Sequence, residues 1–303
     1  MAVEDIAGSA RPPVVLDLDG SVLPLGGERV LALGEWQEEL RFACSRASMR
    51  RFSALLDARL PARHGPVLTG SGDFHHLSYP LLRRLRAPEP YQLIVLDNHP
   101  DNMRYPLGIH CGSWVSWAAA LPQVSHVHVL GITSHDIGSL HAWENRWRPL
   151  LSGKLTYWSM GVPVRWARWL GLGRGFRSFD SPSALVDAFI DTQRRQPQPA
   201  YLSIDKDVFA EEVARTNWDQ GRFRLGHALA VIHAAHEGGL VGSDITGEVS
   251  QYRYRSRLKR LLSALDGQPQ IPGRTLHAWQ AQQREVNRVL LSALAEVPVR
   301  EVR

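Results

Sequence analysis

Residues 93–101 read Leu-Ile-Val-Leu-Asp-Asn-His-Pro-Asp, and this stretch says most about the fold and its chemistry. A short apolar run bounded by polar residues predicts a buried strand. Asp97, His99 and Asp101 follow at alternate positions, which on an extended segment point to one side. Two carboxylates and an imidazole at a buried strand end are costly unless a cation or hydrogen bonds neutralise them. Such mixed ligands suit manganese, iron or zinc. The alternative is a surface turn that caps the next helix.

Similar apolar runs recur along the chain, separated by helix-compatible stretches. Helices are predicted over 182–195, where Ser181 and Pro182 are suitable cap and first residues, and over 225–236, which Gly238-Gly239 ends. A last helix is predicted from about Leu276 to Ala295 with Thr275 as N-cap. Its apolar face is expected to contain Val286, Val289, Leu290, Ala293 and Leu294. The remaining strands are expected near 13–19, 65–70, 126–132, 155–160, 200–205 and 240–245.

This alternation predicts a three-layer α/β/α fold with a mainly parallel central sheet. The 303 residues are interpreted as a single domain, with a core at about 13–250 and a C-terminal helical extension at about 251–303. The Arg-rich region 21–60 is expected to be helical. The sequence shows no leader-like segment and no stretch long enough to cross a membrane. Two cysteines favour a reducing, cytoplasmic location. The net charge of +5 is spread over arginines, which favours solvated helix faces over nucleic-acid binding.

Three further polar clusters lie at predicted strand ends, where ligands collect in parallel α/β folds. They are Ser203-Ile204-Asp205-Lys206-Asp207, the turn Gly70-Ser71-Gly72-Asp73-Phe74-His75-His76, and Gly242-Ser243-Asp244-Ile245-Thr246-Gly247-Glu248. With the first stretch, they offer one histidine of the 75–76 pair and five further ligands. Six ligands with four carboxylates are too many for one transition metal and suit two metals that share bridging aspartates.

These motifs, in this order across roughly residues 65–250, resemble the ureohydrolase family, which includes arginase and agmatinase. That family carries a Gly-Gly-Asp-His-Ser turn, an Asp-x-His-x-Asp strand end, a Ser-x-Asp-x-Asp strand end and a late glutamate. The resemblance implies an arginase-like fold and two divalent ions, most often manganese, around a bridging hydroxide that attacks a guanidino or amidino carbon. The implied ligands are His75, Asp97, His99, Asp101, Asp205 and Asp207, with His76 as the alternative to His75 and with Asp97 and Asp205 as bridges.

The resemblance also implies residues around a substrate. His110 matches a family histidine that shuttles protons, and with Asp101 it is the expected catalytic pair; Glu248 matches the glutamate that holds a guanidinium. Asn102 stands one position before the family's substrate-binding asparagine. Trp218 and Asp219 lie in a polar segment that is either a pocket wall or a capped turn.

Departures from the family pattern surround these residues. Val208-Phe209 replaces the usual Asp-Pro, and Glu248 follows an extra glycine. The expected substrate is therefore a small guanidino, amidino or amide compound other than arginine. Since family members often form trimers or hexamers, a homo-oligomer is possible.

Two other functions remain open at this point. Residues 14–21 resemble the first motif of haloacid-dehalogenase phosphatases, with Asp17 as nucleophile and Asp19 two residues later. That hypothesis leaves His75 and His99 unexplained. The third possibility is a binding protein in which the metal site only braces the fold.

Overall fold

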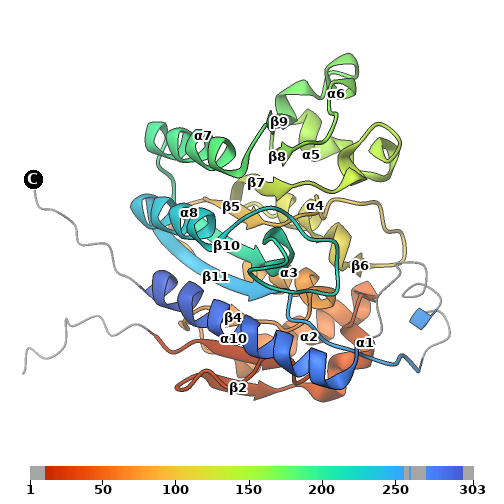
Figure 1. Cartoon of the computed structure of the whole chain (residues 1–303), viewed down its shortest axis with the longest axis vertical. Helices are drawn as coiled ribbons and strands as arrows, with labels where there is room; N and C mark the ends of the chain where they lie inside the picture. The colour runs from red at the N-terminus through yellow and green to blue at the C-terminus, as the bar shows by residue number, and fades with distance from the viewer. Residues whose placement is uncertain (1–10, 256–258, 261–270, 296–303) are drawn as a thin grey trace, which may run out of the picture.

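The computed structural model describes residues 11–255, 259–260 and 271–295. Its centre is a sheet of nine parallel strands in the order β2-β1-β4-β11-β10-β5-β7-β8-β9 (Figure 1). The strands are β1 (Val14–Asp17), β2 (Arg29–Ala32), β4 (Val67–Leu68), β5 (Tyr91–Leu96), β7 (Val124–Ile132), β8 (Leu155–Met160), β9 (Phe176–Phe179), β10 (Ala200–Asp205) and β11 (Leu240–Thr246). A separate antiparallel pair joins β3 (Ala43–Cys44) to β6 (Ile109–His110).

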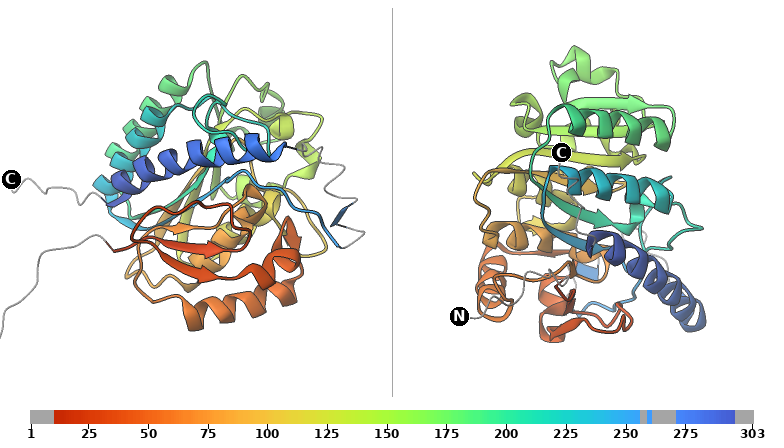
Figure 2. Two further views of the ribbon diagram at one scale, coloured as in Figure 1. Left: turned by 60° about the horizontal axis from the view of Figure 1, so that its bottom comes forward. Right: turned by 90° about the vertical axis from the view of Figure 1, so that its left-hand side faces the viewer.

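Helices cover both faces of the sheet, as the left view of Figure 2 shows. One face carries α2 (Arg46–Arg59), α3 (Ser78–Arg84), α4 (Trp114–Ala119) and α5 (Trp147–Leu151). The other carries α7 (Pro182–Arg195), α8 (Leu225–Gly238) and α10 (Gly273–Ala295). The short helices α1 (Gln37–Leu40) and α6 (Trp166–Trp169) contribute Leu40 and Ala167 to the core on the first face. Short 3-10 segments cover Gly34–Trp36, Gly72–Leu77, Cys111–Ser113, His135–Ile137, Ala142–Glu144, Gly173–Gly175 and Lys206–Val208.

The central strands are apolar on both sides because each side faces a layer of helices. Every residue of β5 is buried. Leu93 and Val95 belong to the core beneath α2, α3 and α4, whereas Ile94 and Leu96 belong to the core beneath α7, α8 and α10. This alternation follows from the two-residue period of a strand. The predicted three-layer fold with a mainly parallel sheet is confirmed.

The seven predicted strands and the helices at 182–195 and 225–236 are all present. Ser181 caps α7 by accepting a hydrogen bond from the Ala184 amide at 3.2 Å, and Gly239, with a φ of 98°, follows the last residue of α8. The single-domain interpretation stays a prediction. Of the expected C-terminal extension, residues 256–258, 261–270 and 296–303 lie outside the described residues.

Three local predictions are wrong. Region 21–60 contains β2 and β3 as well as α1 and α2, because β2 is a short edge strand that forms by pairing with β1. The last helix starts at Gly273, so Thr275 lies in its first turn and is not the N-cap. Val289 is 42% exposed and does not share the buried face of α10, which instead includes polar residues. Within the described residues, no helix is both long and apolar enough to cross a bilayer.

Candidate metal centre

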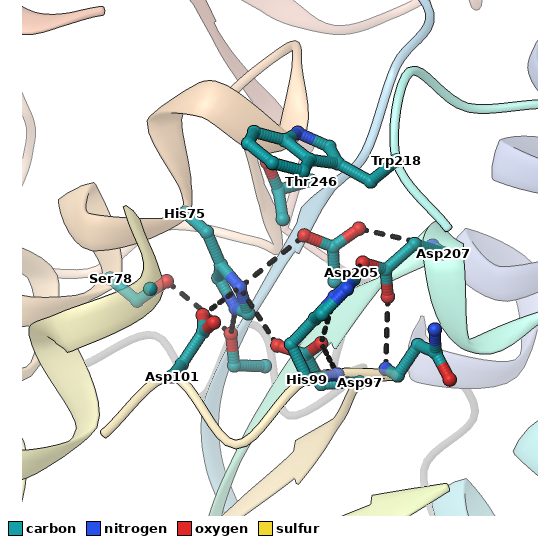
Figure 3. Close-up of polar contacts among 12 residues, drawn as sticks. His75, Ser78, Asp97, His99, Asp101, Asp205, Asp207, Trp218 and Thr246 are labelled. Atoms are coloured by element: carbon teal, nitrogen blue, oxygen red, sulfur yellow. Dashed lines mark hydrogen bonds and ion pairs between the residues drawn. The ribbon is translucent and has the colours of Figure 1, made fainter. Parts of the chain in front are cut away.

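Four strands of the sheet deliver the polar clusters to one place. Strands β4, β11, β10 and β5 are neighbours and parallel, so their carboxyl ends meet at one edge. His75 lies in the 3-10 turn after β4, Asp97 directly follows β5, and Asp205 is the last residue of β10. Figure 3 shows these side chains pointing toward one another. The expected meeting of the three distant segments is therefore observed.

The first group of ligand atoms surrounds the ring nitrogen Nδ1 of His75. This atom lies 2.9 Å from Asp101 Oδ2, 3.2 Å from Asp97 Oδ2 and 3.3 Å from Asp205 Oδ2. All four side chains are buried. The His75, Asp97 and Asp101 atoms form a compact triad that could hold a metal ion.

A second group lies beside the first and shares one residue with it. His99 Nδ1 is 2.8 Å from Asp207 Oδ2 and 3.7 Å from Asp97 Oδ1. Asp97, His99 and Asp207 form the second triad whose atoms could hold a metal. Asp97 thus offers one carboxylate oxygen to each triad, which is the arrangement expected of a residue that bridges two ions.

The chemistry of this cluster fits bound cations. His75 Nδ1 and Asp97 Oδ2 are buried and make no well-oriented hydrogen bond within the described residues, although they face each other. Burial and the charge of Asp97 raise the pKa values of Asp101 and Asp207 to about 7. These shifts reflect crowding of negative charge: the site holds four buried carboxylates, and two imidazoles, even when protonated, would balance only two of them. Divalent cations would satisfy both the orphaned atoms and the excess charge.

The far side of His75 is held by a chain of hydrogen bonds. His75 Nε2 lies 3.0 Å from Ser203 Oγ, and Ser203 donates to Asp244 Oδ1 at 2.7 Å. Ser78 and Tyr201 donate to the same carboxylate at 2.9 and 2.7 Å. Metal-binding histidines commonly have such a carboxylate behind them, because it fixes the ring and its tautomer. His76, the alternative ligand, is buried elsewhere and belongs to neither triad.

Asp101 is held in an unusual backbone conformation. Its φ is 46°, in the left-handed region that aspartate tolerates better than most residues. The Trp114 indole donates a hydrogen bond to its Oδ2 at 2.7 Å, and the Val115 amide bonds to its carbonyl oxygen at 2.9 Å. Helix α4 thereby turns the carboxylate of Asp101 toward His75.

The cluster forms one wall of a cavity of about 720 Å³. His110, Trp218 and Asp219 also line this cavity, as expected of residues near a substrate. Burial lowers the pKa of His110 to about 4, and its Nδ1 accepts a hydrogen bond from the Gly112 amide at 3.0 Å. The ring of His110 is therefore neutral near pH 7. The segment around Trp218 is a pocket wall, which is one of the two alternatives the sequence left open.

Glu248 and Asn102 do not line the cavity, in contrast to the sequence expectation. Glu248 is buried in an ion pair with Lys206, and Asn287 donates to the same oxygen. The Asn102 amide donates to the Arg146 carbonyl at 2.9 Å and to the Tyr157 hydroxyl at 2.7 Å. Both side chains bind other residues of the protein interior, and neither is placed to contact a substrate in the cavity.

The phosphatase-like motif lies apart from the cavity. Asp17 accepts a hydrogen bond from the Gly20 amide at 3.0 Å, and Asp19 pairs with the buried Arg41 at 3.1 Å. Neither aspartate belongs to the cavity lining or to a metal triad. Their contacts are those of a braced turn after β1.

Sequence reasoning did not assign the residues behind His75. A signal for them exists, because Tyr201, Ser203 and Asp205 alternate along a buried strand and therefore share one side of it. The register pairs Ser203 with Asp244 on β11, which completes the contact. Asp136, which also lines the cavity, carries no comparable local pattern.

Comparisons with known proteins bear on the architecture. No protein-family model matches the chain. A relative from Thermotoga maritima, described only as an uncharacterized protein, is 28% identical over 189 residues, which are 62% of this chain and 60% of the relative. This chain therefore aligns with less than two thirds of that protein.

Solved structures match over nearly the whole chain. Proclavaminate amidino hydrolase from Streptomyces clavuligerus superposes with a TM-score of 0.53 at 16% identity, covering 96% of this chain and 95% of the other. Agmatine ureohydrolase of Thermoplasma volcanium gives 0.53 at 14% identity, with 97% and 95% covered. Arginase from Bacillus caldovelox gives 0.50 at 11% identity, with 97% and 100% covered.

The chain has the arginase-like fold. At sequence identities of 11–16% the superpositions show the fold alone, and that fold agrees with the parallel nine-stranded sheet described above.

Proposed function

We propose that this protein is a metal-dependent hydrolase of the ureohydrolase type, which cleaves a carbon–nitrogen bond in a small guanidino or amidino compound. The observation that carries the proposal is the pair of ligand triads that share Asp97 at the wall of a cavity. Solved structures with the same fold include an amidino hydrolase and an agmatine ureohydrolase. The proposed substrate is not arginine, because the two residues expected to contact a family substrate are placed differently: Glu248 pairs with Lys206, and neither Glu248 nor Asn102 lines the cavity.

Six side chains would hold two divalent cations, most suitably manganese given the mixture of carboxylate and imidazole ligands. The residues that would hold them are His75, Asp97, His99, Asp101, Asp205 and Asp207, and the two triads share Asp97. Such a pair, when bound, supplies a Lewis acid and lowers the pKa of water toward neutrality.

The chain's own residues would orient the substrate and move protons. In neutral His110, Nδ1 accepts from the Gly112 amide, so the ring proton sits on Nε2 and can form a hydrogen bond to the substrate. The leaving nitrogen would receive the proton that Asp101 takes from water. Asp101 reaches the same cavity and is the proposed acceptor of the proton that water loses. Trp218 supplies an aromatic wall.

A metal-loaded activity screen tests the proposal. The wild type is loaded with manganese, magnesium or zinc, and its bound metal is measured by mass spectrometry. Guanidino acids, amines, ureides and formimino compounds are then offered as substrates, and the release of urea, ammonia or formamide is measured. We expect two ions per chain and turnover of at least one compound. Asp97→Asn should lose metal and turnover together, whereas Asp191→Asn, an exposed change on α7, should lose neither.

Other outcomes would overturn the assignment. One magnesium per chain with phosphatase activity would favour the Asp17 hypothesis. Tight metal binding without any turnover would favour a braced binding protein. If Asp97→Asn kept two ions per chain, the ligand set itself would be wrong.

A further inference from the structure

The imidazole of His110 lines the cavity and lies between two aromatic rings that are not part of the described cavity lining. The Phe42 ring meets it edge-on, with the ring centroids 4.7 Å apart and the planes at 88°. The Tyr105 ring stacks on it, with centroids 5.1 Å apart and planes at 23°. The imidazole therefore cannot rotate about its bond to Cβ without losing one of these aromatic contacts.

A third contact fixes which nitrogen of His110 carries the proton. The Gly112 amide donates to Nδ1 at 3.0 Å, so Nδ1 is unprotonated. A Cβ atom at position 112 would lie 3.0 Å from His110 Cε1 and 3.2 Å from Nδ1, so a side chain there would push the ring away. Nε2 has no hydrogen-bond partner among the described residues and is not one of their buried unpartnered atoms, so it is open to the cavity.

Phe42 has a backbone conformation that phenylalanine rarely adopts. Its φ is 70°, in the left-handed region. The Ala43 amide donates to the Arg41 carbonyl at 2.9 Å, which closes a γ-turn centred on Phe42, and a γ-turn with positive φ is rare and strained. In the described chain, the other non-glycine residue with positive φ is the candidate ligand Asp101. Backbone strain of this kind concentrates at functional sites, where surrounding contacts maintain it.

Hydrogen bonds on both sides hold the γ-turn in this conformation. The Phe42 amide donates to the Asp73 carbonyl at 2.9 Å, and the Cys111 amide donates to the Phe42 carbonyl at 2.9 Å. Asp73 lies two residues before the candidate ligand His75, and Cys111 directly follows His110. The strained turn therefore joins the segment that carries a candidate metal ligand to the segment that carries the cavity histidine.

We propose that Phe42 and Tyr105 are positioning residues that hold the His110 imidazole in one orientation, with its Nε2 proton presented to the cavity. This inference rests on the proposed hydrolase function, in which that proton forms a hydrogen bond to the substrate. A negative φ at Phe42 would redirect its Cα–Cβ bond and withdraw the ring from His110. The strain at Phe42 is thus the cost of keeping the imidazole in place.

Nuclear magnetic resonance of protein labelled with ¹⁵N-histidine tests the orientation without any turnover. The protein is loaded with zinc, because manganese broadens nearby signals, and His110→Ala identifies the His110 signals. At pH 7, where this ring is neutral, the wild type should show one protonated and one unprotonated ring nitrogen. In Phe42→Leu and Tyr105→Leu the freed ring should exchange between tautomers, which brings its two ¹⁵N shifts together. Phe189→Leu, a buried change in the core on the opposite face of the sheet, should leave both shifts as in the wild type.

A double-mutant cycle tests whether the effect on catalysis passes through His110. The substrate is the guanidino compound that the manganese-loaded wild type hydrolyses fastest in the activity screen. Phe42→Leu and Tyr105→Leu should each lower kcat/KM by about three- to tenfold, because a hydrogen bond to the substrate is weakened. In the His110→Ala background, Tyr105→Leu should lower kcat/KM by less than about twofold. Tyr105→Leu is the cleaner variant, because Tyr105 is only partly buried and Phe42 also stacks on the Trp218 ring at 6.3 Å.

The two measurements separate this inference from the proposed function. Tautomer exchange in Phe42→Leu and Tyr105→Leu, without hydrolysis of any guanidino compound by the wild type, would refute the hydrolase but keep the positioning role. Hydrolysis with unchanged ¹⁵N shifts of His110 in both variants would overturn the positioning role and keep the hydrolase. An equal loss of kcat/KM from Tyr105→Leu with and without His110 would also overturn it, because the Tyr105 ring would then act on the fold as a whole.

Discussion

At the scale of single residues, the position of the Lys206 side chain explains why a lysine can stand between the candidate ligands Asp205 and Asp207. Asp205 and Asp207 face the cavity, and the intervening side chain points the other way. Lys206 is fully buried there, paired with Glu248 and donating to Asn287 Oδ1 at 3.1 Å. Burial lowers the pKa of Lys206, and the neighbouring Glu248 charge opposes that shift. The pair leaves Glu248 engaged with the protein interior.

Removing one partner of this pair is expected to destabilise the fold. Lys206→Met would leave the Glu248 carboxylate buried without its cation, which costs about 3–5 kcal/mol of unfolding free energy. Lys206→Met combined with Glu248→Met should recover most of that loss, because no buried charge remains. Urea unfolding followed by circular dichroism measures both. Equal stability of the two variants would show that the pair is solvated, in conflict with the structure.

At the scale of elements, helix α10 does more than cover an apolar core. Gln283 Oε1 accepts from the Val249 amide at 2.7 Å, and its Nε2 donates to the carbonyls of Gly247 and Arg215 at 2.8 and 2.6 Å. Gln280 adds a bond to the Val249 carbonyl at 3.1 Å. The helix thus ties the chain after β11 to the loop that carries the cavity wall.

Gln283→Leu tests this role of α10. The change places an apolar side chain at this buried position. It leaves the Val249 amide and the carbonyls of Gly247 and Arg215 without partners, so we expect a loss of about 1–3 kcal/mol or more in unfolding free energy. His277→Ala, an exposed change on the same helix, serves as the control and should stay within about 0.5 kcal/mol of the wild type. The two variants are compared by their denaturant unfolding midpoints, provided that the slope of unfolding free energy against denaturant concentration is the same. A Gln283→Leu variant as stable as the control would exclude the tie.

At the scale of the whole molecule, the candidate centre joins segments that are far apart in sequence. His75, Asp97 and Asp205 come from the ends of three strands near the middle of the sheet. Only the folded chain has this binding site, because the unfolded chain does not bring these segments together. Metal binding and global stability should therefore be linked.

Adding manganese is expected to raise the thermal unfolding midpoint of the chelator-treated protein. A metal concentration of 100 times Kd stabilises the native state by about 2.7 kcal/mol per site. The rise should be saturable and reversed by chelation. Scanning calorimetry of Asp97→Asn under the same conditions should show a much smaller shift. An equal shift in that variant would place the stabilising ion somewhere else on the molecule.

Much of the fold and of the centre was predictable from local patterns. Apolar runs ending in Asp97 and Asp205 predict buried parallel strands, and alternation of carboxylates and imidazoles predicts which side chains share a side. Both inferences need only the two-residue period of a strand and the cost of burying charge. The edge strand β2 was missed because it forms by pairing with β1, a contact that no local pattern reports.

By itself, the sequence determined the alternating layers and the candidate ligands, because strand period and buried charge are local properties. Only the tertiary structure separated His75 from its neighbour His76, because consecutive residues of a 3-10 turn point in different directions. It also moved Glu248 and Asn102 away from the cavity and brought Asp136 and Asp219 to it. Those placements depend on long-range partners such as Lys206, Tyr157 and Asn98, which meet only when the chain is folded.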